Sequence, residues 1–156
     1  MNDQNGYDIE DLSVGMSATF SKTITEADII IFAGVSGDIN ALHINEEYAA
    51  TTAFKGRIAH GMLSAGLISA TLANRLPGPG TVYLSQMLNF LAPVRIGDTV
   101  HATVTVREIG ERGRAVLDTT CSVKGVKVID GEATVKIDSS ARRALKAAQS
   151  AAKAVA

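Results

Sequence analysis

The chain has 156 residues, of which 46% are hydrophobic and 20% are charged, with a formal net charge of -1 at pH 7. This length and composition predict one globular domain with a core of its own. The near-zero charge disfavours nucleic acid as a partner, because proteins that follow a phosphate backbone usually carry a basic face. The single cysteine, Cys121, excludes an internal disulfide. We expect neither a signal peptide nor a membrane span, and therefore a cytoplasmic protein.

One strand and three helices are expected in the first half of the chain. Residues 17–24 alternate apolar and polar side chains, which predicts a half-buried strand. Thr25, followed by acidic residues, has the character of a helix N-cap, and Gly37 would end that helix. A short helix is expected near residues 46–51 and a long one at 61–76. Because the long helix is apolar on several sides, we expect other structure to surround most of it.

The second half of the chain has the pattern of strands joined by tight turns. Strands are predicted at residues 82–91, 99–109, 115–123 and 126–137. Helices followed by a run of antiparallel strands predict an α+β fold, in which the long helix packs on one face of a curled sheet. The Ala-rich segment 139–156 carries Arg and Lys but no acidic residue, and is expected to form an appended helix or tail.

Asp38 and His43 lie in the polar segment 37–45, which is predicted to be irregular. A carboxylate and an imidazole on one short loop can converge on a single water, because the imidazole exchanges a proton near neutral pH and the carboxylate orients the water. The alternative is an Asx-type turn, in which Asp38 and Asn40 bond their own backbone. The sequence has no cluster of Cys and His residues with zinc-ligand spacing, and we expect no metal site.

The start of the predicted long helix holds further candidates. Gly61 would leave the first backbone N–H groups of the helix open to a ligand carbonyl, and close packing is the alternative. His60, just before it, is expected to bond neighbouring backbone and fix the turn. A buried helical serine usually bonds the carbonyl one turn back, and neither Ser64 nor Ser69 has an evident base beside it. A serine nucleophile is therefore not expected.

Several segments match one known family in the same order. They are Ser36–His43, Ala50–Phe54, Ala59–Leu63, Tyr83–Gln86 and Pro93–Asp98. Over residues 12–137, the chain resembles the MaoC-like (R)-specific enoyl-CoA hydratases. One departure is Ala41, where the family motif often has proline, and it removes no chemical group.

The resemblance implies a hot-dog fold for residues 1–138, in which a curved antiparallel sheet wraps a long central helix, with residues 139–156 outside it. It also implies a homodimer or larger homo-oligomer that binds acyl-CoA near the subunit interface. The implied reaction is the reversible syn addition of water to a trans-2-enoyl-CoA, which gives an (R)-3-hydroxyacyl-CoA. This reaction needs no cofactor, since coenzyme A is part of the substrate.

The resemblance also implies a role for each matched site residue. Asp38 and His43 correspond to the catalytic pair that activates water. Gly61 corresponds to the backbone donor to the thioester carbonyl, and Ser69 falls near the reacting centre. Asn40 lies within the same motif and supports the catalytic loop at the substrate site.

Other functions are compatible with the same residues. They are a dehydratase for 3-hydroxyacyl groups on acyl carrier protein, a hot-dog thioesterase and a non-catalytic acyl-CoA-binding module. The intact pair of Asp38 and His43 disfavours the last of these. Lys55 and Arg57, in the loop before the long helix, are candidates to contact the CoA phosphates, and a purely solvated role is the alternative.

Overall fold

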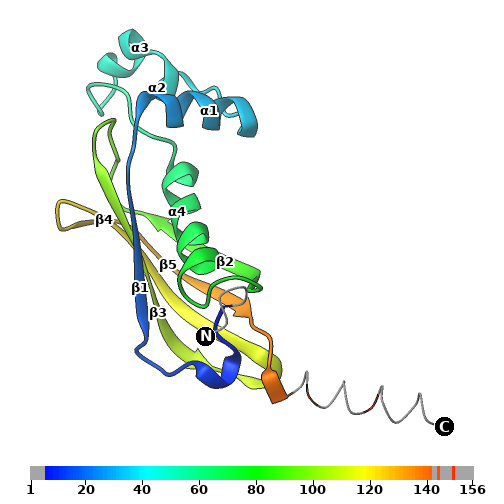
Figure 1. Cartoon of the computed structure of the whole chain (residues 1–156). Coiled ribbons are helices and arrows are strands. Elements are labelled where there is room, and N and C mark those ends of the chain that lie inside the picture. Colours follow the sequence, from blue (N-terminus) through cyan, green and yellow to red (C-terminus); the bar gives the residue numbers. More distant parts are fainter. Residues whose placement is uncertain (1–5, 142–143, 145–148, 150–156) are drawn as a thin grey trace.

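The computed structural model of the chain describes residues 6–141, 144 and 149. A long helix lies against a curved sheet, and three shorter helices gather near one end of it (Figure 1). The strands are β1 (Ser17–Thr23), β2 (Val82–Phe90), β3 (Thr99–Ile109), β4 (Arg114–Val123) and β5 (Val126–Lys136). The helices are α1 (Glu26–Ser36), α2 (Ala41–Ile44), α3 (Glu46–Thr51) and α4 (Gly61–Asn74). Two short 3-10 turns lie at Ile9–Asp11 and Glu111–Gly113.

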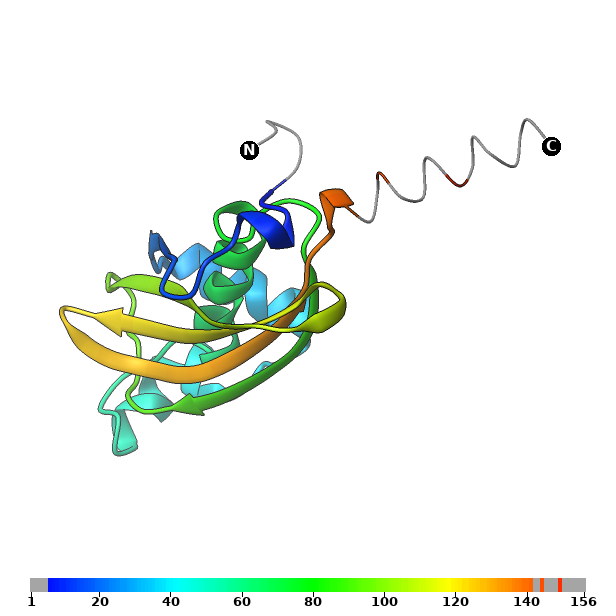
Figure 2. The same ribbon diagram turned by 90° about the horizontal axis from the view of Figure 1, so that it is seen from below.

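The sheet is antiparallel throughout, in the order β1-β3-β4-β5-β2. The strands β3, β4 and β5 are neighbours in sequence and in space. At one edge of the sheet β1 pairs with β3, and at the other edge β2 pairs with β5. The chain therefore leaves the sheet at one edge and returns at the other, and α4 between them crosses the face around which the sheet curves (Figure 2). This arrangement confirms the expected α+β hot-dog fold.

The core lies between α4 and the sheet. Alternate residues of β3 are buried, among them Val100 and Val104, and they belong to the same hydrophobic cluster as Ile68 and Leu72 of α4. Full burial of each such aliphatic side chain contributes about 1.5–3 kcal/mol. This alternation is the pattern from which the strand was predicted, so sequence and packing agree here.

One side of α4 stays uncovered in the single chain. Met62, Gly66 and Ser69 are exposed along it, whereas Ile68 and Leu72 on the sheet side are buried. The expectation that other structure surrounds most of this helix is therefore wrong for one copy of the chain. The apolar and small residues of α4 are thus divided between a face that packs on the sheet and a second face that is exposed.

The strands agree with the predicted ranges to within one residue, whereas one helix ends earlier than predicted and another was not predicted. The helix α4 ends at Asn74 instead of residue 76, because Pro77 disfavours helical backbone at the residue before it. Ala41–Ile44 forms α2 within the segment predicted to be irregular. The Oδ1 atom of Asn40 accepts the Leu42 N–H at 3.0 Å and caps this short helix.

The predicted start of α1 is confirmed. The Oγ1 atom of Thr25 accepts the Asp28 N–H at 3.3 Å, and the Asp28 carboxylate accepts the Thr25 N–H at 2.9 Å, which together form a capping box. Gly37 ends α1 with a positive φ of 76°, as its position in the sequence indicates.

The expected C-terminal helix or tail, residues 139–156, lies largely outside the described residues. Across the part of the chain that the structure covers, no helix combines the length and apolar character needed to span a membrane.

Candidate functional site

A pocket of about 410 Å³ opens at the N-terminal end of α4. Its lining comes from the loop after α1, from α2, from the first turn of α4 and from the end of β2. The polar side chains in this lining are Asp38, His43 and Ser64, and much of the remainder is apolar, including Phe90 and Leu91. An apolar cavity with a few convergent polar groups is typical of a small-molecule site.

Asp38 is held at the pocket by the way in which α1 ends. Gly37 closes the helix and turns the chain, and Asp38 follows it into the pocket lining. The Ser36 Oγ atom accepts the Asp38 N–H at 3.2 Å, and Asp38 Oδ1 accepts the Asn40 N–H at 3.3 Å. The Asx-type turn considered as an alternative is thus present, and the same residue also borders the pocket.

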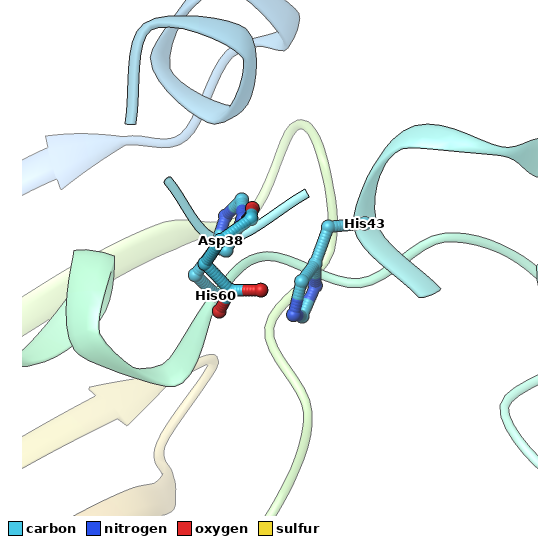
Figure 3. A group of neighbouring side chains, drawn as sticks. All are labelled: Asp38, His43 and His60. Atoms are coloured by element: carbon cyan, nitrogen blue, oxygen red, sulfur yellow. The ribbon is translucent and has the colours of Figure 1, made fainter. Parts of the chain in front are cut away.

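His43 lies in α2 and is only 9% exposed. Its Nδ1 atom is 2.8 Å from the backbone oxygen of Ile58. Because a carbonyl oxygen only accepts, Nδ1–H is the donor, and Nε2 of the neutral ring keeps a lone pair that can take a proton. One metal-ligating or proton-accepting atom from each of Asp38, His43 and His60 lies within 4.8 Å of the others. Figure 3 shows these three side chains gathered at one place.

His60 belongs to this cluster, which the sequence did not indicate. It is 1% exposed, and its Nε2–H donates to the backbone oxygen of Asp38 at 2.9 Å. Its ring centroid lies 3.9 Å from that of His43 and 4.9 Å from that of Phe32. The predicted bond to neighbouring backbone is therefore replaced by one to a residue 22 positions earlier. His60 therefore contacts both members of the Asp38/His43 pair, through a hydrogen bond to the Asp38 backbone and a ring contact with His43.

Gly61 begins α4 and lines the pocket. The first N–H groups of a helix have no intrahelical acceptor and carry partial positive charge, so they can meet an electronegative ligand atom. A Cβ atom at Gly61 would lie 2.7 Å from Cε1 of Phe90. Both explanations of this glycine therefore apply, because it leaves the backbone open and leaves room for the Phe90 ring.

The two serines of α4 occupy different places. Ser64 is buried and lines the pocket, and within the described residues its Oγ atom has no hydrogen-bond partner. The expectation that it bonds the carbonyl one turn back is therefore wrong. Ser69 is exposed on the open side of α4, and Asn40 is exposed at the cap of α2; neither lines the pocket. Their assignment to the substrate site stays a prediction.

Arg57 is engaged by carboxylates. Its Nη2 and Nη1 atoms lie 2.6 and 2.8 Å from the two carboxylate oxygens of Glu26, and its Nε lies 3.3 Å from Glu46 Oε2. The hydrogen bonds from Arg57 lower the pKa of Glu26. A phosphate contact by Arg57 would compete with these bonds, whereas Lys55 is exposed and stays a candidate for that contact.

Asp38, His43 and His60 are also the residue types that ligate metals, and their ligand atoms are close enough to be considered together. The Nε2 atom of His60 is already bonded to the Asp38 carbonyl, and its Nδ1 atom is buried with no partner among the residues that the structure describes. Nδ1 is therefore the atom through which His60 would ligate an ion. The assignment of the cluster to proton transfer rests on His43, whose Nδ1–H is bonded to Ile58 and whose Nε2 keeps a lone pair.

Comparison with known proteins agrees with this chemistry. A family model described as "MaoC like domain" matches residues 12–131. The chain is 60% identical over 129 residues to an (R)-specific enoyl-CoA hydratase of Rhodospirillum rubrum, which covers 82% of this chain and 90% of that protein. It is 56% identical over 129 residues to a 3-hydroxybutyryl-CoA dehydratase of Methylorubrum extorquens, with 82% of each chain covered.

Solved structures give the same result. The fold matches that of an R-hydratase from Pseudomonas aeruginosa with a TM-score of 0.83 and 44% identity, over 86% of this chain and 88% of that one. The range of the family model contains Asp38, His43 and Gly61, which meet at the pocket. This chain therefore belongs to the MaoC-like family.

Proposed function

We propose that the protein is an (R)-specific enoyl-CoA hydratase, which adds water reversibly to a trans-2-enoyl-CoA and forms an (R)-3-hydroxyacyl-CoA. The observation that carries this proposal is the Asp38 carboxylate beside a His43 ring whose Nδ1–H is bonded to Ile58. This bond leaves Nε2 to exchange a proton with water. The hydratase and dehydratase relatives support one reaction in its two directions.

The pocket suggests how the substrate would lie. The acyl chain runs along the apolar wall that includes Phe90 and Leu91, and the thioester carbonyl faces the N–H of Gly61. Asp38 orients a water molecule, His43 Nε2 takes one of its protons, and the water oxygen bonds to C3. The negative charge that develops on the thioester oxygen is stabilised at the start of α4. A proton from the Asp38/His43 pair then returns to C2 on the same face, which completes syn addition.

The proposed reaction uses no metal or redox cofactor, and coenzyme A enters as part of the substrate. We place the protein in the cytoplasm. In support, its single cysteine, Cys121, is a free buried thiol, which fits a reducing compartment.

We infer that two copies pair through β2. This strand lies at an edge of the sheet, and exposed apolar residues lie on it or directly after it: Val82, Leu84, Met87, Phe90 and Leu91. An open apolar strand edge is a template for a second strand and favours burial against another copy. Because Phe90 and Leu91 also line the pocket, the acyl site would lie beside the interface. Sedimentation analysis should give twice the mass of the chain, and a monomer would contradict this inference.

The direct test of the function is hydration of trans-2-enoyl-CoAs of graded chain length, with the chirality of the product determined. We expect (R)-3-hydroxyacyl-CoA and no free coenzyme A. Release of free thiol without a hydroxyacyl product would instead identify a thioesterase. A parallel assay with the same acyl groups on acyl carrier protein distinguishes the carrier, and we expect the CoA thioesters to react faster.

A further inference from the structure

Ser64 carries a buried hydroxyl group that the fold leaves without a partner. The residue is 1% exposed, and within the described residues no hydrogen bond reaches its Oγ atom. A helical serine in this position usually donates to the carbonyl four residues earlier, which here belongs to His60. That carbonyl instead accepts the N–H groups of Leu63 at 3.1 Å and Ser64 at 3.4 Å. A buried hydroxyl without a partner destabilises the fold, and alanine would avoid this penalty.

The position of Ser64 suggests what the hydroxyl is for. It lies three residues after Gly61, so the two residues share one face of α4, and both line the pocket that contains Asp38 and His43. The neighbouring walls include Val94 and Ile129, whose side chains offer no hydrogen-bonding group. Within the described residues, Ser64 has no hydrogen bond to Asp38 or His43, the other polar side chains of the lining, or to His60 one turn earlier, which leaves an occupant of the pocket to supply the partner.

We propose that the Ser64 hydroxyl is a second hydrogen-bond donor to the thioester oxygen of bound acyl-CoA, one helical turn beyond the backbone N–H of Gly61. This inference rests on the proposed function, because it assigns the oxygen that a CoA thioester brings to the pocket. A side-chain hydroxyl and a helix N-terminal N–H aimed at one oxygen bind it in the ground state. They bind it more strongly as it gains negative charge during hydration.

The test compares two ligands that cannot be hydrated: butyryl-CoA, a thioester, and S-butyl-CoA, the thioether that lacks the oxygen. Calorimetry measures both dissociation constants for the wild type and for Ser64→Ala. We expect the substitution to weaken butyryl-CoA about threefold to tenfold and to leave S-butyl-CoA unchanged. The kcat for crotonyl-CoA hydration should fall by about a hundredfold, since the donor acts most strongly on the developing charge.

Thr71→Val is the matched control, because Thr71 is a buried hydroxyl residue of the same helix whose Oγ1 does have a partner, Leu67 O at 2.7 Å. Thr71→Val should lower Tm and leave the preference for the thioester intact. Ser64→Ala should leave Tm unchanged or raise it by about 2–4 °C.

Equal weakening of both ligands by Ser64→Ala, or a loss of Tm like that of Thr71→Val, would show a structural role and overturn the inference while the hydratase function stands. If the wild type fails to hydrate enoyl-CoA but Ser64→Ala still loses the preference for the thioester, the proposed function is refuted while the Ser64 contact with the thioester oxygen stands. A wild type that binds neither ligand would overturn both.

Discussion

Replacing Gly61 with alanine adds one methyl group, whose effect on stability and whose effect on activity can be measured separately. The added Cβ would lie 2.7 Å from Cε1 of Phe90, whereas carbon atoms in contact normally lie about 3.5–4.0 Å apart. Phe90 is 53% exposed in the single chain and lies at the strand edge proposed to pair with a second copy, so its ring can make room only by leaving its preferred rotamer, at a conformational cost of about 0.5–1.5 kcal/mol. Alanine in a helix is favoured over glycine by about 1 kcal/mol. The two effects nearly cancel, and the free energy of unfolding should stay within about 1 kcal/mol of the wild type.

Activity should respond quite differently. The methyl group and the displaced ring both obstruct the approach of a thioester to the first N–H of α4. Loss of one donor to a developing oxyanion lowers kcat by about 10²–10³-fold, or about 2.7–4 kcal/mol. We therefore expect Gly61→Ala to be a folded protein with a severe defect in crotonyl-CoA hydration.

Steady-state hydration kinetics and urea unfolding measure the two effects. Gly34→Ala is the control, because Gly34 lies in α1 and an added Cβ atom there would meet nothing within 4 Å. This variant should keep wild-type kinetics and gain up to about 1 kcal/mol in unfolding free energy, which measures the helix preference without the clash. The double variant Gly61→Ala/Phe90→Ala removes the ring that is pushed aside and should not recover activity. Recovery would mean that ring displacement alone caused the defect, and unchanged kinetics in Gly61→Ala would refute the role of this backbone donor.

Three further results are expected. His60→Ala removes the donor to the Asp38 carbonyl and the ring beside His43, so kcat should fall with little change in KM. Urea unfolding should show that the free energy of unfolding is lower by about 1–3 kcal/mol. An unchanged kcat would refute the positioning role of His60. Asp28→Asn tests the capping box of α1. Chiefly through the bond from the Thr25 N–H, the pKa of Asp28 lies below 3.8 in the folded state, so its stabilisation is complete above pH 3.8 and is lost as the pH falls through the folded pKa. Asp28→Asn should therefore lower the unfolding free energy by about 0.5–2 kcal/mol at pH 7, and this loss should shrink progressively as the pH is lowered below 3.8; a loss that stays constant over that range would contradict this explanation. Burial raises the pKa of Cys121 to about 12, so a thiol-disulfide reagent at pH 8 should modify it only after unfolding; rapid labelling of the native protein would show that the thiol is accessible.

The fold was predictable from the sequence where local pattern and final packing coincide. The alternation along residues 99–109 reports burial against α4 directly, and Thr25 caps α1 through residues that are its neighbours in sequence. The helix α2 was missed because a single turn has no periodicity to detect, although Asn40, which caps it, was visible in the segment.

The site was predictable only in part. Asp38 and His43 are close in sequence, so their meeting at the pocket could be anticipated, and the family resemblance added Gly61. The contact of His60 with the Asp38 carbonyl joins residues 22 positions apart and depends on how α4 approaches the loop after α1. The unpaired hydroxyl of Ser64 likewise depends on tertiary packing, because the usual helical rule would have given it a partner.

The central claim is that Asp38 and His43 together activate the water that adds to the enoyl-CoA. The most direct test is the rate of crotonyl-CoA hydration by Asp38→Asn and His43→Gln, each shown by circular dichroism and by its oligomeric mass to be folded as the wild type is. Since a positioned acid–base group contributes about 10²–10⁴-fold, each variant should lose activity by that order. Wild-type rates in both folded variants would contradict the account.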